Sequence, residues 1–307
     1  DTVTTVIVYD TSEKNAEANI DALYELLLEY HRLYDIYNAY DGLNNLYTVN
    51  ENAGVAPVAV DEKILGLIEY AKEMDALTGG RMNIAMGGVL AIWQTYRDAG
   101  LEDPDHAALP PMQELRAANE HADIASVVVD RAAGTLYVSD PLTRIDVGAI
   151  GKGYAAQKAI EAMEAAGVTA MLLSVGGNVC SIGTRADGSD WSVGIRDPYS
   201  DGTLYAVGVN GQSVVTSGTY ERYYTVDGKR YHHIIDPETL MPSTHCDSVT
   251  VISEDSALAD ALTTGLFCMT VEEGTALVDS LPGTEALWVL PDGTQWQSKG
   301  FSAYLSD

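Results

Sequence analysis

Short β-branched segments separated by turns fill the second half of this chain, and they constrain its fold more than any other feature. An Asp-Gly pair at 227–228 is typical of a tight two-residue turn, so a hairpin is expected over Tyr220–Val226 and Lys229–Ile235. The same alternation predicts further strands at Thr2–Tyr9, in both halves of Ser126–Ser139, and at Ala170–Val175, Trp191–Ile195, Leu204–Val209, Ser213–Thr216, Ser248–Ile252 and Ala286–Leu290.

Helices are fewer and stand between the hairpins. Apolar residues at helical spacing predict them at Ala16–Tyr34, Asp61–Leu77, Gly151–Ala166 and Ala257–Met269. Strands and helices that do not alternate regularly favour an α+β fold, rich in antiparallel sheet with helices packed on the sheets, over a doubly wound nucleotide fold. We expect a single domain over residues 1–307, with Leu101–Pro111 as a loose connector inside it.

The charge of the chain limits its partners. The 307 residues carry a formal net charge of -28 and give a pI of about 4.3, so binding of nucleic acid is not expected. An anionic substrate must then be held by a local cluster or a metal ion against the overall field. No stretch reaches the ~20 apolar residues of a membrane span. The chain opens at Asp1 without methionine, so we expect a trimmed start from which a targeting segment was removed.

The three cysteines do not indicate a redox site. Cys180, Cys246 and Cys268 form no C-x-x-C pair, and their odd number argues against a disulfide framework. Cys180 and Cys268 stand in apolar runs, which predicts buried, inert thiols.

A glycine-rich junction at Arg144–Ala159 is the first candidate site. The pattern predicts a strand that ends at Asp146, a tight backbone path through glycines, and a helix that begins near Lys152. Main-chain N–H groups at a helix N-terminus together with one lysine suit a diphosphate. The spacing differs from a Walker A loop, and an ordinary strand-to-helix turn needs the same glycines.

The helix at Ser256–Met269 is the second candidate. Asp260 and Thr264 are four residues apart, so their oxygens face the same side of the helix. A carboxylate and a hydroxyl are hard ligands that suit Mg²⁺. Such a pair also arises from hydrogen bonding within a helix.

Two adjacent histidines in the predicted hairpin are the third candidate. His232 and His233 would point to opposite faces of a strand, so only one of them can face a given site. An imidazole can accept a proton from a hydroxyl at neutral pH. The alternative is a histidine that merely bonds to its sheet neighbours, and the tyrosines of this hairpin are expected to pack.

Taken together, these segments resemble the FAD:protein FMN transferases, also called ApbE-like flavin transferases. Five blocks match in order and span about two thirds of the chain: Met82–Trp93, Arg144–Ala155, Leu172–Asn178, Val215–Pro242 and Ser248–Phe267. The resemblance implies an ApbE-like fold and a reaction in which FMN passes from FAD to a Thr or Ser hydroxyl of an acceptor protein while AMP leaves.

The resemblance also implies a Mg²⁺ site beside the diphosphate. The position of Ala149 supplies a main-chain carbonyl to the metal, and those of Asp260 and Thr264 complete its protein ligands. The positions of Asp146 and Lys152 contact FAD.

On the flavin side, the resemblance implies four more residues. His233 is implicated in transfer, and we expect it to take the proton of the attacking hydroxyl. Ile234 would lie against the flavin nucleotide, and Trp93 falls in the aromatic FAD-binding block. Tyr40 matches an aromatic contact near the N-terminal helix. His232 is then expected to be structural.

Several departures from the family pattern fall near the site, although none replaces a proposed metal ligand. Leu240 stands where most relatives have glycine, so the turn after Asp236-Pro237 is expected to differ. Gly88 replaces a proline, and Gln94 and Thr95 replace the Gly-Phe that usually follows the tryptophan. A methionine contact would lie upstream of Asp1.

Two other activities remain open at this point. A Mg²⁺-dependent FAD pyrophosphatase would use water in place of the protein hydroxyl, and a secreted flavin-binding protein would not turn FAD over. The family is exported and often lipid-anchored, so the resemblance implies an acceptor redox protein at the cell envelope and membrane association only through such an anchor.

Overall fold

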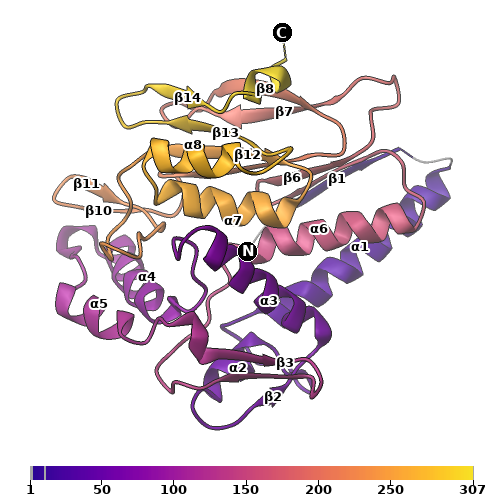
Figure 1. The fold of residues 1–307 in the computed structure, drawn as a ribbon. Helices are drawn as coiled ribbons and strands as arrows, with labels where there is room; N and C mark the ends of the chain where they lie inside the picture. The colour runs from indigo at the N-terminus through magenta and orange to yellow at the C-terminus, as the bar shows by residue number, and fades with distance from the viewer. Residues whose placement is uncertain (1–2, 10–11, 307) are drawn as a thin grey trace. The chain divides into compact units, whose positions relative to one another are not determined.

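The chain divides into two compact units, each assembled from separated stretches of sequence (Figure 1). The computed structural model describes residues 3–9 and 12–306. The first unit comprises residues 1–29, 150–218 and 245–307, and the second comprises residues 30–149 and 219–244. Thr2, the predicted start of the first strand, lies outside the described residues. A single domain over residues 1–307 stays a prediction.

A seven-stranded antiparallel sheet forms the centre of the first unit. Within it, strand β12 (Ser248–Ser253) pairs Thr250 with Thr216 on one side and with Leu287 on the other. All six residues of β12 are buried, including the polar Ser248, Thr250 and Ser253, because this strand is paired on both edges inside the sheet. The strands follow the order β1 (Thr4–Val8), β5 (Met171–Val175), β6 (Asn178–Ile182), β9 (Ser213–Gly218), β12 (Ser248–Ser253), β13 (Glu285–Val289) and β14 (Gln295–Gln297).

Both faces of this sheet are covered. Met171 and Leu173 of β5 pack toward α6 (Gly151–Ala165), whereas Leu172 packs with Trp191 of β7 on the opposite face. This is the alternation expected of a strand. Figure 1 shows α6 and α7 (Ser256–Phe267) on one side of the sheet and the hairpin β7 (Trp191–Arg196)–β8 (Thr203–Val209) on the other. Helix α8 (Val271–Asp279) follows α7 and contacts β13.

The second unit is mainly helical. Its helices are the last turn of α1 (Glu13–Tyr34), α2 (Leu46–Glu51), α3 (Glu62–Leu77), α4 (Gly87–Glu102) and α5 (Met112–Asn119). A small sheet runs in the order β2 (Val58–Ala59), β4 (Thr135–Val138), β3 (Val127–Asp130). The hairpin β10 (Tyr224–Val226)–β11 (Lys229–Tyr231) packs on α4 around Trp93, Tyr224 and Leu240.

The predicted fold class is confirmed, since strands outnumber helices and every strand pair in the described chain is antiparallel. The predicted Asp-Gly turn is also present, with left-handed φ angles of +50° at Asp227 and +78° at Gly228. All three cysteines are free and buried. Within the described residues, none of the helices has the length and apolar character needed to cross a bilayer.

Candidate functional site

The predicted strand that ends at Asp146 does not form. Arg144 makes only an isolated bridge to Met86. The reason lies in Asn50, whose side chain accepts the main-chain N–H of Ile145 at 2.7 Å and donates to its carbonyl at 2.9 Å. These are the groups that a neighbouring strand would need, so the amide replaces the ladder and leaves Asp146 in a loop.

The loop holds the Asp146 carboxyl in place before α6 begins. Its Oδ1 accepts the Gly148 N–H at 2.7 Å, and its own N–H donates to the carbonyl of Ile84 at 2.8 Å. Burial raises the pKa of the Asp146 carboxyl above its ordinary value, although Gly148 and the charge of Arg222 act in the opposite direction. A carboxyl fixed in this way can accept a hydrogen bond from a ligand, which is compatible with its predicted contact to FAD.

Helix α6 brings Lys152 to the Asp260 carboxylate of α7. The Lys152 Nζ lies 3.4 Å from Oδ1, and the Gly153 N–H donates to Oδ2 at 2.8 Å. The two helices touch at this point: a Cβ on residue 153 would lie 2.3 Å from the Cβ of Asp260 and 2.5 Å from the carbonyl of Ser256. Glycine at 153 therefore serves the close packing that places the carboxylate at the start of α6.

The two adjacent threonines of helix α7, Thr263 and Thr264, lie in different surroundings. Thr263 is fully buried, and its hydroxyl donates to the carbonyl of Asp260 at 2.8 Å and bonds to Ser217 at 3.0 Å. Thr264 is only half-buried and lies one turn after Asp260, as predicted. Asp260 itself is buried, with 4% of its surface exposed. Thr263 is thus a structural residue, and Thr264 remains the candidate ligand.

The donors at this point fit a hard divalent cation. The Asp260 carboxylate has about four lone-pair positions, of which the bonds from Lys152 and Gly153 use two. The described residues contain no group of three or more His, Cys, Asp or Glu side chains that could hold a metal ion. The predicted set has only one such side chain, Asp260, beside a hydroxyl and a carbonyl. Mg²⁺ commonly takes one or two carboxylates and completes its shell with water and phosphate oxygens.

The two histidines lie just after a strand and not within it, which corrects the sequence interpretation. Strand β11 ends at Tyr231. His232 is buried; its Nδ1 accepts the N–H of Ile234 at 3.2 Å, and its Nε2 donates to the carbonyl of Ser243 at 2.9 Å. The bond to Ile234 turns the backbone out of the ladder. His232 therefore has the structural role that was predicted, while His233 is half-buried.

The turn after these histidines has a leucine in a left-handed conformation at position 240. Leu240 adopts φ +59°, a left-handed conformation that glycine accommodates without strain. The expected difference from the turn of the relatives stays a prediction. The side chain is 5% exposed and packs with Trp93 and Tyr224. Its carbonyl accepts the Trp93 Nε1–H at 2.9 Å. Burial of the leucine offsets the strain of its backbone.

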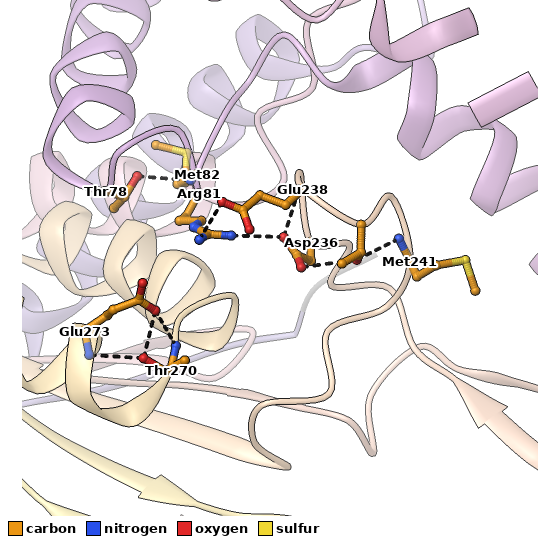
Figure 2. Close-up of polar contacts among 9 residues, drawn as sticks. Thr78, Arg81, Met82, Asp236, Glu238, Met241, Thr270 and Glu273 are labelled. Atoms are coloured by element: carbon orange, nitrogen blue, oxygen red, sulfur yellow. Dashed lines mark hydrogen bonds and ion pairs between the residues drawn. The ribbon is translucent and has the colours of Figure 1, made fainter. Parts of the chain in front are cut away.

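Arg81 contacts this turn and was not identified from the sequence. Figure 2 shows its guanidinium between two carboxylates, 3.3 Å from the buried Oδ1 of Asp236 and 2.8 Å from Oε1 of Glu238. An arginine after two glycines resembles an ordinary helix end, so only the carboxylates far along the chain reveal its partner. Gly153 was noted only for its backbone freedom, and its bond to Asp260 was also missed.

The predicted aromatic contacts differ in their surroundings. Trp93 is buried, and its ring lies against Tyr231 and Tyr224 at centroid distances of 6.4 and 6.5 Å. Tyr40 is half-buried, and its hydroxyl donates to Asp35 at 2.8 Å. Trp93 is thus a core residue whose N–H is already bonded, whereas the Tyr40 ring is held at a partly open position. Their contacts with FAD stay predictions.

The nine predicted site residues divide between the two units. Lys152, Asp260 and Thr264 belong to the first unit, where the structure brings the first two into contact. The others belong to the second, where His233 and Ile234 are chain neighbours; Ala149 ends the long segment of that unit. The joint ligation of a metal by Ala149, Asp260 and Thr264 stays a prediction.

The structure thus combines an antiparallel α+β fold with a buried aspartate that contacts a glycine-rich helix start. A sequence model of the ApbE family matches residues 1–288, and the chain belongs to this family.

Among its relatives, the FAD:protein FMN transferase of Treponema pallidum is 37% identical over 263 residues, which cover 80% of this chain and 71% of that protein. The FAD:protein FMN transferase of Klebsiella pneumoniae is 33% identical over 276 residues, covering 89% and 82%. The crystal structure of the ApbE protein from Thermotoga maritima matches with a TM-score of 0.85 at 29% identity, covering 99% of this chain and 96% of that one.

Proposed function

We propose that this protein transfers FMN from FAD to a Thr or Ser hydroxyl of an acceptor protein, in a Mg²⁺-dependent reaction that releases AMP. Membership of the ApbE family and the activity named for its relatives support the transfer of FMN from FAD to a protein. The observation that carries the proposed site is the contact of Lys152 and Gly153 with the buried carboxylate of Asp260.

The proposed step is a displacement at the phosphorus on the FMN side of the diphosphate. The acceptor oxygen forms a bond to this phosphorus, the bond to the AMP oxygen breaks, and AMP leaves with the electron pair. The hydroxyl proton passes to the imidazole of His233. General-base assistance of this kind typically contributes about 10²–10⁴-fold.

The charge of the chain explains why the site needs cations. A diphosphate must enter a protein of net charge -28, so positive charge has to be supplied locally. A Mg²⁺ ion held by Asp260, Thr264 and the Ala149 carbonyl would neutralise the diphosphate and stabilise the charge that develops on the leaving phosphate. Lys152 adds a charge at the N-terminus of α6, where main-chain N–H groups also favour an anion.

The remaining predicted residues are proposed to contact FAD itself. We assign Asp146 to a polar contact and Tyr40 to an aromatic contact, because their positions are fixed by Gly148 and by Asp35. Ile234 would offer an apolar surface beside His233. Trp93 would support this surface from the core behind it, in line with its burial.

Intact mass of a candidate acceptor redox domain tests the proposal. With FAD and Mg²⁺ we expect the acceptor to gain one FMN, and AMP to appear in equal amount. Free FMN without a gain on the acceptor would identify a pyrophosphatase, and persistent FAD would indicate a binding protein without turnover. His233→Ala should slow transfer while FAD binding is retained; full rate in this variant would remove its assigned role.

We also propose that the acceptor and this protein meet at the cell envelope, with a lipid anchor as the only membrane attachment. Cell fractionation followed by immunoblotting measures this directly. Recovery in the cytoplasm would contradict it.

A further inference from the structure

We propose that Arg81 is a positioning residue for the transfer reaction, which holds the turn Asp236–Met241 and thereby orients His233 and Ile234. The inference rests on the proposed function, because it assigns Arg81 an effect on the residues that we expect to act on FAD.

The backbone that carries Arg81 is itself fixed. Gly79 and Gly80 both adopt left-handed conformations, with φ of +61° and +82°, and so end α3 and redirect the chain. The Thr78 hydroxyl donates to the carbonyl of Met74 at 2.8 Å. It also accepts the Met82 N–H at 3.0 Å (Figure 2). The backbone on the N-terminal side of Arg81 is therefore held in place by hydrogen bonds.

Arg81 meets a carboxylate that needs a counter-charge. The side chain of Asp236 is 6% exposed and that of Arg81 is 16% exposed, whereas that of Glu238 is 70% exposed. A buried carboxylate that loses its cation is left uncompensated, while an exposed pair contributes little. The ion pair of Arg81 with Asp236 therefore contributes more stability than its ion pair with Glu238. Glu238 mainly orients the guanidinium through its other nitrogen.

Asp236 also stabilises the turn that follows the histidines. Its Oδ1 accepts the Glu238 N–H at 2.9 Å and its Oδ2 accepts the Thr239 hydroxyl at 3.1 Å. Its carbonyl accepts the Leu240 N–H at 2.8 Å, and its own N–H donates to the Met241 carbonyl at 2.9 Å. Every polar group of this residue is used to shape the turn, so the ion pair with Arg81 sets where the turn sits.

The turn and the catalytic segment form one closed loop. Ile235 bridges to Pro242, and His232 bonds to the Ser243 carbonyl, so the chain before the turn is tied to the chain after it. His233 and Ile234 lie within this loop. A shift of the turn therefore moves both residues, and a misplacement of about 1 Å at a reacting group can lower a rate by about 10²-fold.

The test compares Arg81→Ala and Arg81→Lys with a matched control. Arg131 also bridges two carboxylates of its unit, Glu62 and Glu69, but it is exposed and lies in the turn between β3 and β4, which contains none of the proposed site residues. We expect Arg81→Ala to lower kcat for transfer to the acceptor domain by about 10–100-fold. Arg81→Lys, which keeps a charge near Asp236, should recover part of this loss, and Arg131→Ala should retain the wild-type rate.

A double-mutant cycle separates positioning from a purely structural role. If Arg81 acts through His233, Arg81→Ala should have little further effect on kcat in a His233→Ala background. An equal loss in both backgrounds, or no loss in either, would overturn the inference. If Arg81→Ala does not fold, the same double-mutant cycle is measured with Arg81→Lys and His233→Ala.

A measurement without turnover distinguishes this inference from the proposed function. In ¹H–¹³C NMR spectra of the free protein, the imidazole resonance of His233 is identified by its absence in His233→Ala. We expect Arg81→Lys to shift this resonance, and Arg131→Ala to leave it unchanged. An unchanged resonance would refute the positioning role. Lack of FMN transfer by the wild-type protein would refute the proposed function alone.

Discussion

Leu240 gives the sharpest stability prediction, because its backbone and its side chain have opposite effects. Its φ of +59° costs about 1–2 kcal/mol for a residue with a Cβ. Its side chain is buried beside Trp93, and truncation of a buried leucine to alanine typically costs about 2–5 kcal/mol. Leu240→Ala loses the burial and keeps the strain, whereas Leu240→Gly loses the burial and releases the strain.

We therefore expect both variants to be less stable than the wild type, and the glycine variant to be more stable than the alanine variant by about 1 kcal/mol. This difference corresponds to about a fivefold ratio of folded to unfolded protein. Urea unfolding followed by tryptophan fluorescence reports on it through Trp93, which bonds to the Leu240 carbonyl.

Asp227 supplies the control, since it has φ +50° but is exposed in the hairpin turn. Asp227→Gly should be at least as stable as Asp227→Ala, and neither should show the large loss that follows removal of a buried side chain. An alanine variant at 240 that equals or exceeds the glycine variant in stability would refute the reasoning.

Three further predictions concern residues that shape the site. Gly153→Ala should destabilise the protein by about 1–3 kcal/mol and weaken Mg²⁺ binding measured by calorimetry, because the added methyl group would strike Asp260; wild-type affinity would contradict this. Burial raises the pKa of Asp35, but hydrogen bonds from the residues around it outweigh this effect and hold the pKa below its ordinary value. Asp35→Asn should therefore cost stability above about pH 4 and progressively less as the pH falls through the lowered pKa, and a loss independent of pH in urea unfolding would refute the role of its charge. Asn50→Ala should cost about 1–3 kcal/mol, since both main-chain groups of Ile145 lose their partner, and hydrogen exchange at the Ile145 amide should rise.

The parts of the fold that were predictable are those in which local chemistry and tertiary packing agree. The Asp-Gly turn at 227–228 adopts the left-handed angles that its sequence favours. The apolar spacing of α1 and α3 likewise coincides with the faces that they bury. At such positions short-range sequence determines the structure.

The parts that escaped prediction depend on distant partners. Helix α4 begins at Gly87 without a side-chain cap, and a Cβ at this position would lie 2.5 Å from the carbonyl of Arg144. Local sequence indicates a turn at this glycine pair, whereas the structure shows that Gly87 allows close packing against Arg144. Helix α8 is different: Thr270 and Glu273 form a capping box (Figure 2), a signal that the sequence does contain.

The site residues also divide into those that local sequence predicts and those whose contacts depend on distant parts of the chain. The spacing of Asp260 and Thr264 predicts correctly that both lie on one helix, one turn apart. The contact of Lys152 with Asp260 joins residues 108 positions apart, and the pair Arg81–Asp236 joins residues 155 positions apart. No local pattern contains such pairs, because they arise only when separated stretches of chain fold into one unit.

The central claim is that Asp260 supports Mg²⁺-dependent delivery of FMN to a protein hydroxyl. The most direct measurement is the intact mass of a candidate acceptor redox domain after incubation with FAD, with Mg²⁺ or with EDTA, and with wild-type protein or Asp260→Ala. We expect the acceptor to gain one FMN only with the wild-type protein and Mg²⁺. An equal gain with EDTA or with Asp260→Ala would contradict the account.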